Sequence, residues 1–260
     1  MGIDILVIPD TQVVPGSPIE HFVALGNLAV ERKPEYIVHI GDHWDMNALS
    51  SYDVGKKAAE NARYQDDIEA GVYALACFEE PIRVYSNQRI KNKKKPYKPE
   101  KHFAIGNHEN RIMRYVNDYP VLAGKLSFND LLLEEEGWVV HNYLEMFTIR
   151  GVTFSHLFLN PESNSRRPFT STVDTQLKNL GFSFVAGHLP GLYIANPRYR
   201  LDGTITRGVV AGSFYLHDFS YQNPPQGNQY WRGALMLREV NDGNFMLEEI
   251  PINWLMENYL

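Results

Sequence analysis

The chain of 260 residues has the composition of an ordinary globular protein, with 44% hydrophobic and 22% charged residues. These values exclude a disordered chain, a collagen-like repeat and a small disulfide-stapled fold. The net charge of -6 argues against a protein that coats nucleic acid through its overall charge. Cys77 is the one cysteine, so no internal disulfide can form and a reducing compartment is expected.

The amino terminus, MGIDILVIPD, has neither the positively charged region nor the A-x-A site of a signal peptide. No apolar run approaches the roughly 18 residues that a membrane span requires. We therefore expect a soluble, cytoplasmic protein with no membrane partner. The length favours one domain over residues 1–260.

Apolar runs and helical spacing alternate in the first half of the chain. Short continuous apolar runs predict buried strands at residues 3–8, 36–40 and 102–105. Helical patterns cover residues 19–32, 54–80, 109–119 and 130–136. Between residues 83 and 101, eight basic residues stand against one acid, and Pro96 and Pro99 predict a loop there.

The second half of the chain is mostly β in character. Strands are predicted at residues 139–143, 146–150, 152–155, 182–186, 205–211, 231–240 and 245–250, with a helix at 171–180. Arg150-Gly151 and Asp242-Gly243 are turn signals.

Five of the predicted strands are each followed by residues that can bind a metal ion. These are Asp10-Thr11-Gln12, Gly41-Asp42-His43-Trp44-Asp45, Gly106-Asn107-His108-Glu109, then His156, and finally Gly187-His188. Functional sites of open α/β sheets lie at the carboxyl ends of the strands. We therefore expect these motifs, far apart in the sequence, to converge in one cleft, with the glycines permitting sharp turns before the ligands.

The order of these motifs resembles that of calcineurin-like metallophosphoesterases, from residue 10 to residue 188. Residues 49–57, 211–218, 225–228 and 231–233 are similar to a subgroup common in bacteriophage genomes, which implies a phage-encoded protein in the host cytoplasm. The resemblance implies an α/β sandwich of two mixed β-sheets flanked by helices. It also implies hydrolysis of a phosphate ester by direct attack of a metal-activated water.

The resemblance further implies two divalent metal ions that share the carboxylate of Asp42. One ion is expected on Asp42, Asn107, His156 and His188, a mixed oxygen and imidazole set that suits Mn, Fe, Zn or Ni. The other is expected on Asp10, Asp42 and Gln12.

The sequence departs from the family pattern at this other ion, because Gln12 and Pro190 stand where imidazoles are usual. Oxygen ligands alone favour Mn or Mg and bind weakly, so Mn is the expected metal and one site is expected to be weak. His217, near the end of a predicted strand, is a candidate replacement ligand.

The resemblance assigns acid catalysis to His108, with Asp45 behind it. A carboxylate fixes the imidazole tautomer and raises its pKa, which suits a general acid. Asn107 is expected to contact the phosphate in addition to the metal, and Arg111 is a candidate phosphate clamp.

Each assignment has a structural alternative. Asp10, Asp42 and Asp45 could be helix caps or turn acids, His156, His188 and His217 could be structural histidines, Gln12 could be a hydrogen-bond donor behind the ligands, and Arg111 could pair with Glu109.

The basic segment, residues 83–101, suggests a class of substrate. Lys93, Lys94 and Lys95, shortly before Gly106, favour a phosphodiester such as DNA or a nucleotide, and thus a nuclease or other phosphodiesterase. A solvated loop is the alternative. Tyr221, Tyr230 and Trp231 could stack on bases or belong to the core. Two other functions stay open, a phosphomonoesterase for small molecules or phosphoproteins and a degenerate, non-catalytic metal-binding interaction module.

Overall fold

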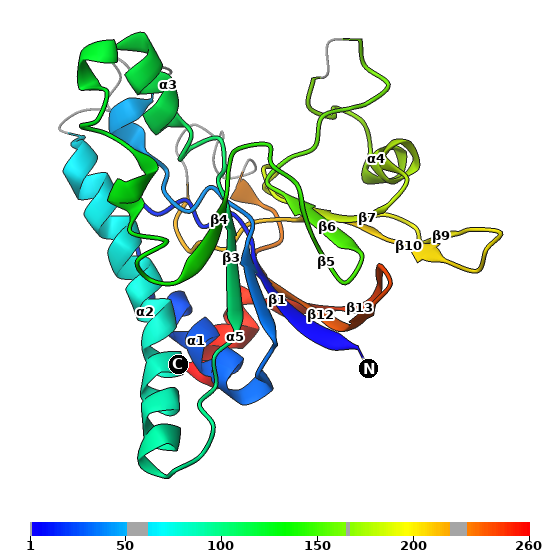
Figure 1. Ribbon diagram of the computed structural model, residues 1–260, viewed down its shortest axis with the longest axis horizontal. Helices are drawn as coiled ribbons and strands as arrows, with labels where there is room; N and C mark the ends of the chain where they lie inside the picture. Colours follow the sequence, from blue (N-terminus) through cyan, green and yellow to red (C-terminus); the bar gives the residue numbers. More distant parts are fainter. Residues whose placement is uncertain (1, 51–61, 165–166, 219–227) are drawn as a thin grey trace.

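The computed structural model describes residues 2–50, 62–164, 167–218 and 228–260 (Figure 1). It contains two mixed β-sheets flanked by helices, which confirms the predicted fold class. The strands are β1 (Ile3–Ile8), β2 (Tyr36–His39), β3 (Glu100–Ala104), β4 (Trp138–His141), β5 (Phe147–Ile149), β6 (Val152–Ser155), β7 (Ser183–Ala186), β8 (Leu192–Ile194), β9 (Arg198–Tyr199), β10 (Ile205–Thr206), β11 (Gly208–Ala211), β12 (Gly233–Asn241) and β13 (Asn244–Pro251).

Six strands form the first sheet in the order β13-β12-β1-β2-β3-β4, and five form the second in the order β5-β6-β7-β11-β8. The helices are α1 (Glu20–Arg32), α2 (Tyr64–Lys91), α3 (Arg111–Asp118), α4 (Val173–Leu180) and α5 (Ile252–Tyr259). Among the described residues, none of these helices has the length and apolar character needed to cross a membrane.

The alternation of side chains along β1 explains how the layers are held together. Leu6 and Ile8 pack in the core shared with α1, α2 and α5, whereas Ile5 and Val7 pack in the core between the two sheets. Both faces of β1 are therefore buried, as its continuous apolar run predicts. On the far side of the second sheet, Leu177 of α4 packs in a third core.

Strand direction brings the ends of both sheets together. β1, β2, β3 and β4 run parallel to one another, as do β6, β7 and β11, so the carboxyl ends within each set lie at the same edge. The backbone of the segment after β11 reaches the end of β1, where the Phe214 amide donates to the Asp10 carbonyl at 2.7 Å. The loops that carry the predicted ligands therefore meet at one edge.

Several local predictions require correction. The structure continues α2 to Lys91, past Pro81, where the sequence predicted a loop from residue 83. Residues 83–91 contain no proline or glycine, and cations near a helix carboxyl terminus are favourable. The predicted helix at 130–136 is a 3₁₀ turn at Phe128–Leu131, and β8, β9 and α5 were not predicted. The part of the 54–80 helix before residue 62 lies outside the described residues.

Both hairpin predictions are confirmed. Arg150 and Gly151 have φ angles of 47° and 83°, and Asp242 and Gly243 have 47° and 81°. Positive φ at both central residues is typical of the turn that matches the twist of two antiparallel strands. These turns join β5 to β6 and β12 to β13.

Candidate metal centre

Three of the predicted ligands converge where the two sheets meet. Asp42 follows β2, His156 follows β6 and His188 follows β7, and their ligand atoms all lie within 4.8 Å of one another. Asp42 and His156 are each 1% exposed, whereas His188 is exposed to solvent. The protein therefore has a cluster of Asp and His side chains that could bind a metal ion and that opens to solvent beside His188.

Asn107, which follows β3, completes the predicted set. Its side-chain oxygen lies 3.0 Å from Nε2 of His156 and 2.7 Å from Nδ1 of His188. Nε2 of His156 also lies 3.3 Å from Oδ2 of Asp42. The four ligands expected for one metal ion are thus brought together.

The tautomer of His156 suits a ligand. Its Nδ1 lies 2.9 Å from the carbonyl oxygen of Ile40, an acceptor that requires a proton on Nδ1. In the neutral ring, Nε2 then carries a lone pair and faces two oxygens, of Asn107 and Asp42. Nε2 of His156 and these two oxygens would then all be acceptors, so a cation or a second proton must lie between them. The residues present therefore fit a metal ion.

The pKa shifts of Asp42, His156 and His188 also suit a metal site. Burial alone would raise the pKa of Asp42, but the charges of His156 and His108 outweigh burial and hold it below its usual value. Burial opposes charge on His156 as well, yet Asp42 raises its pKa to about 10. Burial and the neighbouring His156 lower the pKa of His188. Asp42 is therefore an anion that attracts positive charge, either a second proton on His156 or a metal ion. His156 would bind a metal in its neutral form, after loss of that second proton, and His188 is already neutral.

Backbone strain marks the same loops. Gln12, Asp42 and His188 have φ angles of 40°, 50° and 71°, in the left-handed region that residues with a Cβ rarely adopt. Residues held in this region often belong to functional sites. A Cβ at Gly106 would lie 2.1 Å from Oδ1 of Asp42, so this position requires glycine for the loops to approach.

Asp10 and Gln12, the ligands expected for the second ion, lie next to this cluster. The Asp10 carboxylate accepts a hydrogen bond from the backbone amide of His188 at 3.0 Å. The backbone amide of Gln12 donates to the backbone carbonyl of Asp42 at 2.9 Å. The side-chain oxygen of Gln12 is buried and has no hydrogen-bond partner among the described residues. A buried side-chain oxygen without a hydrogen-bond partner is suited to bind a metal ion.

His108 and Asp45 form the predicted pair. Nδ1 of His108 lies 2.8 Å from Oδ1 of Asp45, and its Nε2 lies 3.8 Å from Oδ2 of Asp42. Burial would lower the pKa of His108, but Asp42 and Asp45 together raise it to about 9. Asp45 does not cap a helix, since the 3₁₀ turn at Asn47–Leu49 follows Met46 and has no side-chain cap.

Arg111 supports this pair from α3. Its guanidinium donates to the backbone carbonyls of Asp45 at 2.7 Å and Met46 at 3.2 Å, and it also lies 3.4 Å from Nε2 of His108. It was predicted as a phosphate clamp or a partner of Glu109. The structure places it where it holds the Asp45 loop and flanks His108.

Glu109 is the residue whose importance the sequence analysis missed. Its buried carboxylate accepts four backbone amide hydrogen bonds, from Asp42 at 3.0 Å, His43 at 2.6 Å, Trp44 at 3.0 Å and Gly106 at 2.8 Å. Burial, and then Asp42, raises its pKa to about 7. It therefore ties the loop after β2 to the loop after β3. The motif contains Glu109 directly after His108, but its role depends on contacts between two loops that the sequence does not show.

The remaining candidates that the structure describes are not members of the cluster of Asp42, His156 and His188. The ring of His217 stacks on Tyr215, with centroids 4.9 Å apart, and burial lowers its pKa. Tyr230 faces Arg232, and Trp231 packs against the core between the sheets. Tyr221 and most of residues 49–57 and 225–228 fall outside the described residues.

The predicted lysines are not brought to the metal cluster. Lys93, Lys94 and Lys95 lie between the end of α2 and the start of β3, whereas Asn107 follows the end of β3. A strand of five residues such as β3 spans about 17 Å. Proximity in sequence therefore did not translate into proximity in space.

Comparison with known proteins does not identify the family. No family model matches the chain, and no curated protein matches it. A solved crystal structure aligns with 96% of this chain and 100% of its own, at 11% sequence identity and a TM-score of 0.40. That score is too low to support an inference, so the resemblance seen in the motifs stays a prediction.

Proposed function

We propose that this protein is a metal-dependent phosphoesterase whose active site is the cluster of Asp42, His156 and His188. The observation that carries the proposal is the combination of this cluster with the His108–Asp45 pair beside it. A purely metal-binding module would have no need for a further imidazole, outside the ligand set, with its own carboxylate. The pair therefore favours catalysis over a non-catalytic interaction module.

The ligands proposed for one ion are Asp42, Asn107, His156 and His188. Asp10 and Gln12 are proposed for a second ion, which shares the Asp42 carboxylate with the first. When bound, such ions supply a water nucleophile at neutral pH and neutralise the charge of a phosphate ester. The chain orients these ligands with its own groups. The Ile40 carbonyl fixes the ring of His156, and the Glu109 carboxylate fixes the backbone amides of Asp42, His43 and Trp44.

The proposed role of His108 is to deliver a proton to the leaving oxygen. Asp45 binds the Nδ1 side of the ring, so the proton to be transferred is on Nε2, the nitrogen that faces Asp42. A positioned acid of this kind contributes about 10²–10⁴-fold to the rate. Arg111 holds the carbonyl of Asp45 and thereby positions the pair.

We propose a phosphodiester, such as DNA or a nucleotide, as the substrate class. The exposed position of His188 supports this choice, because it leaves the cluster accessible to an extended substrate. Mn is the proposed metal, since the second ligand set offers only oxygen atoms.

Hydrolysis of aryl phosphates after metal removal tests the proposal. Protein stripped with a chelator should be inactive, and added Mn should restore turnover of bis-p-nitrophenyl phosphate above that of p-nitrophenyl phosphate. Mg, Fe, Ni and Zn are compared in parallel. Faster turnover of the monoester would instead indicate a phosphomonoesterase, and no turnover with any of these metals would contradict an enzymatic function.

Replacing Gln12 with histidine should lower the Mn concentration needed for half-maximal activity. The reason is that an imidazole binds Mn more tightly than a neutral amide oxygen, and His tolerates positive φ better than most residues. Titration of activity with Mn measures the effect. The matched control is Gln65→His on α2, where Gln65 is exposed and pairs with Glu69. An unchanged requirement in Gln12→His would remove Gln12 from the metal site.

A further inference from the structure

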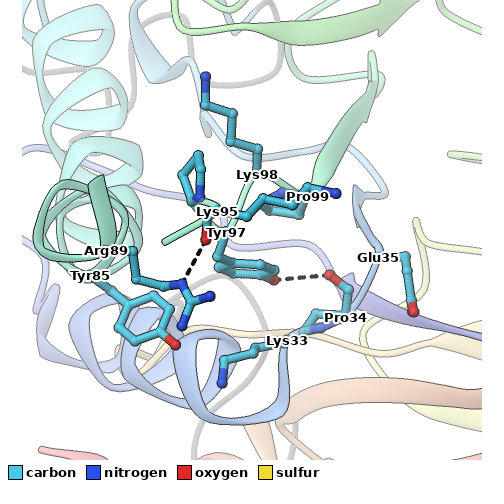
Figure 2. A pocket seen from close by; sticks show the side chains of 10 residues that line it. Lys33, Pro34, Glu35, Tyr85, Arg89, Lys95, Tyr97, Lys98 and Pro99 are labelled. Carbon is cyan, nitrogen blue, oxygen red and sulfur yellow. Dashed lines mark hydrogen bonds between the residues drawn. The ribbon is translucent and has the colours of Figure 1, made fainter. Parts of the chain in front are cut away.

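A pocket of about 510 Å³ lies at the edge of the first sheet opposite the metal cluster, between the end of α2 and the starts of β2 and β3. Figure 2 shows its lining from close by. Lysine, arginine, tyrosine and proline make up nearly all of it, and the residues are Lys33, Pro34, Glu35, Tyr85, Arg89, Lys95, Pro96, Tyr97, Lys98 and Pro99.

Hydrogen bonds hold the loop that forms one wall of this pocket. Arg89 donates from Nε to the Lys95 carbonyl at 2.6 Å, and the Tyr97 hydroxyl donates to the Pro34 carbonyl at 2.9 Å (Figure 2). The hydroxyl of Ser86 on α2 donates to the Tyr97 carbonyl at 2.5 Å. Together with the prolines, these bonds preform the pocket, so a ligand would not have to order the loop.

Positive charge is concentrated around Tyr85. The Lys33 ammonium lies 5.3 Å from the centre of its ring and the Arg89 guanidinium 5.8 Å, and Lys33 lowers the pKa of its hydroxyl. Lys95 and Lys98 add two more cations to the lining. The one acid in the lining, Glu35, accepts a hydrogen bond from the Asp4 amide at 2.8 Å. The cations therefore exceed the acid, in a protein whose net charge is -6.

We propose that this pocket binds a nucleotide unit, either free or within a single strand of nucleic acid. Phosphate would be bound by Lys33, Arg89 and Lys95, and the base would lie on tyrosine and proline rings. Half of the lining residues are tyrosine or proline. Such rings give a bare inorganic anion no advantage, but they suit the flat face of a base.

This site is separate from the metal cluster and does not depend on the phosphoesterase activity proposed above. Binding is therefore measured with a chelator present, which removes any contribution from bound metal. Binding at this pocket would not show that the protein is a phosphoesterase, which has its own assay. Absence of binding would not contradict the phosphoesterase proposal.

Fluorescence anisotropy of a labelled single strand of about ten nucleotides tests the proposal. The double variant Lys33→Gln/Lys95→Gln should weaken binding and reduce the slope of log affinity against log salt by about 1.4, because two cationic contacts to the phosphates of a single strand are lost. The matched control is Lys93→Gln/Lys94→Gln, which removes the same charge from the same loop outside the pocket lining. The control should keep the slope of the parent. Equal losses in the two double variants, or no binding by the parent, would overturn the proposal.

Removal of a ring distinguishes a base from a simple anion. Tyr85→Leu should weaken binding by at least about fivefold, the range of one stacked base. Tyr73→Leu, on the same helix, is the control, since Tyr73 is 61% exposed and outside the lining. Circular dichroism checks that both variants fold. An unaffected Tyr85→Leu would overturn the assignment of a base.

Competition identifies the source of the nucleotide. Displacement of the labelled strand by a nucleoside monophosphate would support free nucleotides as ligands. Displacement by the unlabelled strand but not by the monophosphate would support nucleic acid. Inorganic pyrophosphate should compete poorly. Displacement by pyrophosphate as effective as that by the monophosphate would contradict nucleotide binding, because the base would then contribute nothing.

Discussion

Replacing Asp42 with alanine should abolish the proposed phosphoester hydrolysis, with a loss of at least about 10³-fold, or ~4 kcal/mol in the activation barrier. The reason is that its carboxylate is the buried anion around which His156, His108 and Asn107 are arranged. Without it, the imidazoles have no shared counter-charge and a metal ion loses its anionic ligand. Turnover of the aryl diester with saturating Mn measures the effect, and metal content after dialysis should fall in parallel.

Two controls separate a catalytic loss from unfolding. Asp66→Ala removes an exposed carboxylate from α2 and should keep the activity of the parent. The thermal midpoint of Asp42→Ala should stay near that of the parent, because its loop keeps three backbone hydrogen bonds to the Glu109 carboxylate. A folded Asp42→Ala protein that remains active with Mn would contradict the proposed site.

Replacing His108 with glutamine should lower kcat by about 10²–10⁴-fold while leaving metal content intact. Glutamine keeps a polar side chain but cannot deliver a proton to the leaving oxygen. The deficit should be large for alkyl esters, whose leaving oxygen must be protonated, and small for p-nitrophenyl esters. Equal losses on good and poor leaving groups would rule out His108 as the acid.

Asp45 offers an independent test of the same role. If Asp45 acts through His108, then Asp45→Asn should reduce kcat less than His108→Gln does, and the double variant should be no slower than His108→Gln alone. A strictly additive loss would show that Asp45 acts separately from His108. The 2.8 Å contact between the two side chains makes the non-additive result the expected one.

The ligand candidates could be predicted from the sequence because they depend on local chain properties. Continuous apolar runs such as Ile3–Ile8 predict buried strands, and parallel strands place the loops at their carboxyl ends along one edge. Asp42, Asn107, His156 and His188 each follow the end of such a strand by at most three residues, and the structure brings all four together. The hairpin at Asp242 and Gly243 was predictable for the same reason, since two adjacent residues decide the turn.

Other features depend on contacts between segments far apart in the chain, and the sequence alone did not indicate them. Glu109 becomes a central residue only because the loop after β2 lies against the loop after β3 and presents its amides to one carboxylate. In the same way, α2 continues beyond Pro81 although a proline there is a local signal to end the helix.

The basic segment illustrates the division most clearly. Its charge and its prolines are evident in the sequence, and so is its position shortly before the motif of Asn107 and His108. Only the tertiary structure decides that β3 separates the segment from the metal cluster and that Lys33, at the end of α1, and Tyr85, on α2, complete a pocket with it. The sequence determines which side chains follow the end of a strand, because these residues are covalently joined to the strand. Packing determines which distant groups share a surface, because burial of apolar faces sets how the layers stack.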